Sequence, residues 1–187
     1  MKITWMASLA VPFLMAADNQ PTLNPPTTPP PVEVTPKVIC FGCSPVEQKT
    51  AEFFEEEGVK DMKALSVIMG AIKQESKFNS KVCEGGAITG YHGCRSGGFG
   101  ILQWTYPSRF HGLGTFARRT NSSPNSFDTQ LEYAMTEVEW KRASKTFKTT
   151  GLAMNSYFHA GHVWLGYGVK GARHNYAYQY TKKLFIV

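Results

Sequence analysis

The sequence predicts an α+β domain in which helices dominate and a small Gly-rich β-hairpin or sheet lines a cleft. Of the 187 residues, 42% are hydrophobic and 13% are aromatic, which is enough for one core and excludes wholesale disorder. Apolar residues recur at helical spacing in several segments. Seven glycines lie between residues 83 and 100, and their entropic cost excludes a helix there.

Two segments precede the predicted domain. Residues 3–17 are uncharged and mostly apolar, but they contain Pro12 and are shorter than the ~20 residues that span a bilayer. Residues 1–17 therefore predict a signal-like or membrane-seeking hydrophobic leader, either cleaved on export or retained. Residues 18–43 predict a linker with a Cys-x-x-Cys pair, because seven prolines between residues 18 and 37 favour an extended polyproline spacer. The predicted domain covers residues 44–187, with its start between 38 and 44.

The first two helices have clear local signals. Ser44 can cap a helix, Pro45 suits its first position and Glu47 completes a capping box, so we expect a helix that ends near Gly58. Asp61 begins a second helix that ends between residues 75 and 77. Its apolar residues fall at i, i+3, i+4 and i+7 and predict one buried face, made of Leu65, Ile68, Met69 and Ile72.

Four further segments read as helices after the Gly-rich stretch. They cover residues 108–119, 128–142, 155–165 and 172–185, with a cap at Ser126 or Asp128 for the second of them. Residues 128–142 form the strongest pattern and predict one continuous helix with Leu131 and Val138 on its buried face.

The end of the second helix carries the residues most suited to chemistry. Burial of Glu75 against apolar neighbours disfavours its charged form and raises its pKa, as a general acid requires. Gln103 offers a donor and an acceptor, while Tyr91, Trp104 and Tyr106 offer flat faces suited to sugar rings, although Trp104 also fits a core. A helix-end Glu, a Gly-lined cleft and aromatic walls together predict glycoside cleavage.

The ordered motifs resemble the phage tail lysozyme family, near goose-type lysozymes and lytic transglycosylases. They are FFEEEGV at 53–59, GAIKQESKFN at 70–79, GFGILQW at 98–104 with Arg109, and DTQL at 128–131. The resemblance implies a lysozyme-like fold and a peptidoglycan substrate cut between N-acetylmuramic acid and N-acetylglucosamine. It also implies that Glu75 is the catalytic acid, that Ser76, Gln103 and Trp104 belong to the cleft, and that Arg109 is structural or at the cleft edge.

The second catalytic group is left open by the sequence. Glu84 is the one acidic residue between Glu75 and Asp128, and a hydrolase needs a second carboxylate near the acid. If Glu84 faces Glu75, the pair predicts a muramidase. If it does not, the reaction is that of a lytic transglycosylase, in which Glu75 acts alone and the muramic 6-hydroxyl attacks.

Three states are open for the four cysteines. Cys83 and Cys94 flank the Gly-rich loop and suggest a disulfide, whereas Cys40 and Cys43 allow a second disulfide. The alternatives are a four-Cys zinc site and free thiols. No cofactor or metal is predicted for catalysis, because His159 and His162 have too few acidic or Cys neighbours for a metal site.

The charge pattern and the composition limit the classes of partner that we expect. The net charge is +6, but no run of Lys or Arg exceeds two, which argues against a dedicated nucleic-acid arm. We expect bacterial peptidoglycan as partner, with phage tail proteins and, through residues 3–17, a membrane as further partners. The expected location is the virion tail or, after export, the periplasm and cell envelope. The rival hypotheses are a non-catalytic, glycan-binding tail or envelope protein and a zinc-stabilised interaction domain.

Overall fold

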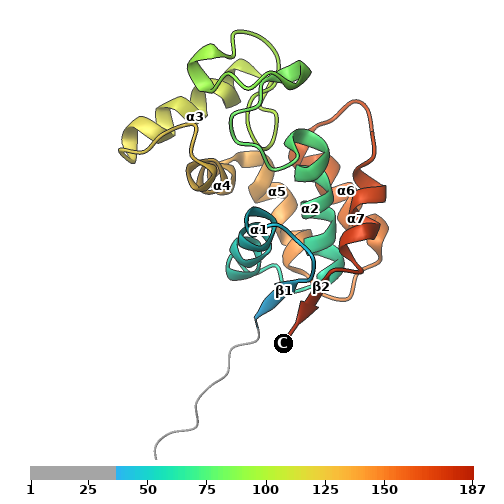
Figure 1. Ribbon diagram of the computed structural model, residues 1–187. Coiled ribbons are helices and arrows are strands. Elements are labelled where there is room, and N and C mark those ends of the chain that lie inside the picture. Colours follow the sequence, from blue (N-terminus) through green and yellow to red (C-terminus); the bar gives the residue numbers. More distant parts are fainter. Residues whose placement is uncertain (1–36) are drawn as a thin grey trace, which may run out of the picture. The chain divides into compact units, whose positions relative to one another are not determined.

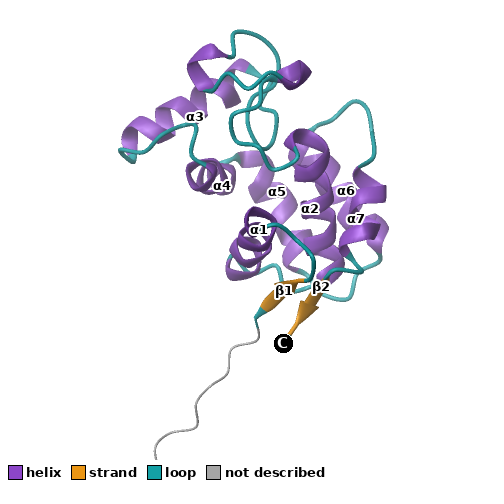
Figure 2. Cartoon of the chain, viewed as in Figure 1, coloured by secondary structure: helices purple, strands orange, loops and turns teal. Residues whose placement is uncertain are grey.

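A computed structural model describes residues 37–187, which form a mostly helical α+β domain (Figure 2). The predicted class is confirmed. The predicted leader at residues 1–17 and residues 18–36 of the predicted linker lie outside the described residues. The elements are β1 (Val38–Cys40), α1 (Pro45–Glu56), α2 (Met62–Ser76), α3 (Pro107–Arg119), α4 (Phe127–Thr136), α5 (Val138–Lys148), α6 (Met154–Leu165), α7 (Arg173–Tyr180) and β2 (Leu184–Ile186).

The predicted starts of the first two helices are confirmed. Ser44 and Glu47 form the capping box of α1, with Pro45 as its first residue. The Asp61 side chain accepts a hydrogen bond from the Lys63 amide and caps α2. These local contacts satisfy amides that have no partner within the helix.

Helix α2 lies in the middle of the domain and contacts α1, α5, α6 and α7 (Figure 1). Its closest approach is to α7, at Gly70. A Cβ atom at Gly70 would lie 2.5 Å from the Ala177 amide nitrogen, so a glycine is required for the two backbones to meet. This approach brings the first residue of α7, Arg173, close to the end of α2.

The sheet joins the two ends of the described chain (Figure 1). Strands β1 and β2 are antiparallel, with Ile39 opposite Phe185, and the side chains of Val38 and Cys40 are buried. Strand β1 thus places the start of the folded region at the early end of the predicted range of 38–44. The predicted helix over 172–185 is too long, because the chain leaves α7 after Tyr180 and pairs as β2.

The Gly-rich stretch is a loop without a sheet of its own. It holds two short 3-10 turns, Glu84–Gly86 and Tyr91–Gly93, and two isolated bridges, Val82 with Ile88 and Cys83 with Phe99. The predicted hairpin is thus reduced to single bridges, because the glycines and turns interrupt the ladder.

The four cysteines form two disulfides. Cys83 pairs with Cys94 across the Gly-rich loop, and Cys40 pairs with Cys43 after β1. These pairs leave no thiolate for a four-Cys zinc site or for the free-thiol alternative.

The predicted helix over residues 128–142 is wrong as a single element. Glu137 has an extended backbone (φ −68°, ψ 145°) that separates α4 from α5. Its side chain is buried and turned toward Arg109 and Trp104, which explains the break. No helix within residues 37–187 combines the length and the apolar character needed to cross a membrane.

Candidate active site

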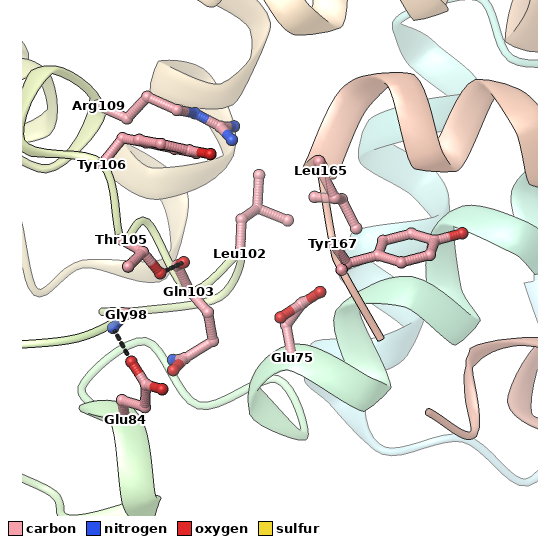
Figure 3. A pocket seen from close by; sticks show the side chains of 12 residues that line it. Glu75, Glu84, Gly98, Leu102, Gln103, Thr105, Tyr106, Arg109, Leu165 and Tyr167 are labelled. Atoms are coloured by element: carbon pink, nitrogen blue, oxygen red, sulfur yellow. Dashed lines mark hydrogen bonds between the residues drawn. The ribbon is translucent and has the colours of Figure 1, made fainter. Parts of the chain in front are cut away.

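A cavity of about 430 Å³ lies between the end of α2, the Gly-rich loop and the loop that follows α6 (Figure 3). Both candidate carboxylates, Glu75 and Glu84, line it. The other lining residues are Gly98, Leu102, Gln103, Thr105, Tyr106, Arg109, Leu165, Gly166, Tyr167 and Gly168. The cavity therefore brings together segments that are far apart in the sequence.

Glu75 lies in the last turn of α2, and its side chain is only 12% exposed. Arg173 forms an ion pair with it: Nε lies 3.1 Å from Oε1, and Nη2 also donates to Oε1. Burial raises the pKa of Glu75 and outweighs the opposing hydrogen bond and charge of Arg173. The carboxyl group is thus biased toward the protonated form that a general acid needs.

Glu84 is exposed and begins the first turn of the Gly-rich loop. Its Oε2 accepts a hydrogen bond of 2.8 Å from the Gly98 amide (Figure 3). Its own amide donates to the Gly98 carbonyl at 2.7 Å. These two bonds hold the Glu84 carboxylate against one wall of the cavity. Glu84 thus lines the same cavity as Glu75.

Gln103 lies between the two carboxylates, at the floor of the cavity (Figure 3). Its backbone is left-handed (φ 51°), a conformation that costs free energy for a residue other than glycine. Its Nε2 donates to the Gly100 carbonyl at 2.9 Å and to the Val82 carbonyl at 3.3 Å. Gly98 permits the tight turn, since a Cβ there would lie 2.8 Å from the Gln103 Cβ. The side-chain oxygen of Gln103 takes no part in these two bonds, so it can accept a hydrogen bond from a ligand.

Two tyrosines supply aromatic surface to the cavity from opposite sides (Figure 3). Tyr106 precedes α3, lines the cavity and is 65% exposed. Tyr167 follows α6 and packs under the guanidinium of Arg173, 4.0 Å from the ring centre. Faces of this kind suit the apolar faces of sugar rings.

Three residues predicted to bind substrate have structural positions instead. Trp104 is fully buried, and its Nε1 donates to the Glu137 carboxylate at 3.0 Å, so its ring belongs to the core. Tyr91 is buried, its ring stacks on that of Phe110 at 4.4 Å, and its hydroxyl donates to the Phe110 carbonyl at 3.1 Å. Ser76 is buried and donates to backbone carbonyls, at one edge of a neighbouring cavity of about 370 Å³ that Glu75 and Gln103 also line.

The sequence interpretation missed three residues near the site. Arg173 and Tyr167 lie more than 90 positions after Glu75 in the sequence, and no local pattern links them to it. Glu137 holds Arg109 through two bonds of 2.7 Å, and Arg109 lines the cavity as the cleft-edge expectation proposed. The three glycines around Tyr167, at 166, 168 and 171, were the one available signal of a loop there.

Across the part of the chain that the structure describes, no group of three or more His, Cys, Asp or Glu side chains is arranged to hold a metal ion. A family model described as phage tail lysozyme matches residues 45–184. No curated protein and no solved structure matches the chain significantly.

Proposed function

Because the chain belongs to the phage tail lysozyme family, we propose that it is a muramidase that cleaves the β-1,4 bond between N-acetylmuramic acid and N-acetylglucosamine in peptidoglycan. Membership of the family indicates a lysozyme-like domain that acts on peptidoglycan, and the cavity chemistry supports the finer reaction. The observation that carries the proposal is Glu75, a largely buried carboxyl group with a raised pKa in a cavity that holds a second carboxylate.

Glu75 is the general acid of the proposed reaction. In its protonated form it transfers a proton to the glycosidic oxygen, so that the sugar leaves as a neutral alcohol. A carboxyl group with an ordinary pKa is ionised at neutral pH and holds no proton to donate. Burial at the end of α2 keeps Glu75 closer to the protonated form.

Glu84 is the second carboxylate of the proposed reaction. It is exposed on the cavity wall, and one of its oxygens is held by the Gly98 amide. The other oxygen is available to take a proton from an attacking water molecule. In this proposal the buried Glu75 is the acid and the exposed Glu84 is the base.

The remaining cavity residues bind the glycan. Tyr106 and Tyr167 offer ring faces to the sugars, and the Gln103 amide can bond to an N-acetyl or hydroxyl group. A phage tail lysozyme acts at the cell envelope, so we propose that the protein opens the wall during infection or lysis, as part of the virion tail or after export. Contact with phage tail proteins, and membrane contact through residues 3–17, belong to this proposal.

The test is mass spectrometry of the products released from purified peptidoglycan. The wild type should release muropeptides with reducing ends, since water is the nucleophile. Glu75→Gln should release none while keeping its fold by circular dichroism, and Glu84→Gln should lose most activity. Glu132→Gln, an exposed change on α4, is the matched control and should match the wild type.

Each result has a defined meaning. Products lighter by one water, with 1,6-anhydro ends, would replace the muramidase with a transglycosylase in which Glu75 acts alone. Full activity in Glu75→Gln would remove the proposed active site. Binding to peptidoglycan without any products from the wild type would favour a non-catalytic glycan-binding module.

A further inference from the structure

We infer that Arg173 is a positioning residue that holds one oxygen of Glu75, leaves the other to face the substrate, and ties the acid to the loop that walls the cavity. The inference rests on the proposed function of Glu75. Arg173 itself is buried and has no direct part in the proposed proton transfer.

The hydrogen bonds of Glu75 are one-sided. Both contacts from Arg173 go to Oε1, one from Nε at 3.1 Å and one from Nη2. Within residues 37–187, Oε2 has no hydrogen-bond partner. A proton on Oε1 would compete with the Arg173 donors, so the catalytic proton belongs on Oε2, which is free to face the glycosidic oxygen.

The same guanidinium group organises the loop between α6 and α7. Its Nη1 donates to the carbonyls of Val169 and Lys170, at 2.7 and 2.8 Å, and its plane lies over Tyr167. The loop contributes Gly166, Tyr167 and Gly168 to the cavity wall. One side chain thus sets both the orientation of the acid and the position of the aromatic wall beside it.

Arg173 also provides the nearest opposing charge for Glu75. The charged groups that act on Glu75 are Arg173 from α7 and Arg109 from α3, while Tyr167 and Glu84 are the other titratable residues that line the cavity. Arg109 is engaged by Glu137, so Arg173 is the cation that bonds directly to the acid. Without Arg173 only the charge of Arg109 opposes the effect of burial, and the pKa of Glu75 rises further.

The test compares Arg173→Gln, Arg173→Lys and the control Arg142→Gln, an exposed arginine on α5. The pH profile of kcat/KM on a soluble glycan substrate reports the pKa of the acid in the free enzyme through its alkaline limb. For Arg173→Gln we expect this limb to move to higher pH and kcat to fall by about 10- to 100-fold, because the acid is no longer oriented. Arg173→Lys keeps the positive charge but loses the planar guanidinium group with its paired donors. The alkaline limb of its pH profile should therefore stay near the wild-type position while kcat falls.

The outcomes separate positioning from a merely structural role. If kcat is unchanged in Arg173→Lys, the fork does not orient Glu75 and the inference is overturned, even if Arg173→Gln does not fold. An alkaline limb that does not move in a folded Arg173→Gln variant also overturns it. Inactive Glu75→Gln with unchanged Arg173 variants would leave the proposed function intact, whereas active Glu75→Gln would remove the function itself.

Discussion

Glu137 is a buried carboxylate that contacts Arg109 at the cavity and Trp104 in the core. Its two oxygens accept two hydrogen bonds of 2.7 Å from the Arg109 fork, and both lie 3.0 Å from the Trp104 indole nitrogen. Bidentate pairing of this kind is the geometry in which Arg and a carboxylate bind most strongly. The pair anchors α3 to the junction of α4 and α5, and it holds Arg109 at the edge of the cavity.

Replacement of Glu137 by Ala should strongly destabilise the protein. The Arg109 guanidinium would remain buried without its partner, and breaking a buried pair in this way costs about 3–5 kcal/mol. Urea denaturation measures the change in the free energy of unfolding. Glu132→Ala, at an exposed position of α4, should change it by less than about 0.5 kcal/mol. Equal stability of the two variants would contradict this account of Glu137.

For individual residues, local sequence signals indicate only part of the candidate site. Glu75 was proposed for the site because it ends an apolar helix in the sequence, and Gln103 because it follows a Gly-rich stretch; both line the cavity. The sequence left the position of Trp104 undecided between the core and the cleft. Its position in the core depends on a hydrogen bond to Glu137, which lies 33 positions later. Arg173 could not be predicted, because its contact with Glu75 spans 98 positions.

At the scale of elements, Glu47 connects three helices. It caps α1 with Ser44, it accepts a hydrogen bond from Lys73 of α2 at 3.1 Å, and it accepts another from the Tyr180 hydroxyl of α7. Burial by itself raises the pKa of Glu47, but the hydrogen bonds from Tyr180, Ser44 and Lys73 lower it to about 2. The ionised form of Glu47 therefore stabilises the packing of α1 on α2 and α7.

This pKa predicts a specific pH dependence of stability. Because the pKa of Glu47 falls from 4.5 to about 2 on folding, its contribution is complete above pH 4.5 and is lost as the pH falls toward 2. The contribution is on the order of 3 kcal/mol. Glu47→Gln should be less stable than the wild type by this amount at pH 7, and the gap in unfolding free energy should close between pH 4.5 and 2. A gap that is the same at every pH would assign the effect to packing alone.

Helix ends differ in how far the sequence predicts them. The starts of α1 and α2 depend on Ser44 and Asp61, which act within three residues and were predicted. The break at Glu137 was missed because the residues 128–142 have a continuous helical pattern and the competing ion pair comes from Arg109, 28 positions earlier. The end of α7 was missed for the same reason, since β2 forms only by pairing with β1.

For the whole domain, the sheet joins residues that are far apart in the sequence and closes the fold. The backbone of Lys37 exchanges two hydrogen bonds of 3.0 Å with Val187, and Val38 and Leu184 contribute to the core. The sequence left the domain start between 38 and 44, because the prolines predict a linker and the first clear helix signal is Ser44. A strand of three residues has no pattern of its own, and its partner lies at the other end of the domain.

Removal of β1 tests whether this closure matters for the entire fold. We compare chains that begin at residue 37 and at residue 44 by urea denaturation. The shorter chain loses the buried Val38 side chain, the ladder to β2 and the Cys40–Cys43 disulfide, so its free energy of unfolding should fall by at least about 3 kcal/mol. Glu75 lies at the opposite end of α2 from the sheet (Figure 1), so both chains should cleave peptidoglycan at equal initial rates at a temperature where both are folded. Equal stability of the two chains would mean that residues 37–43 are not needed for the fold. A loss of rate in the folded shorter chain would show that the sheet influences the cavity.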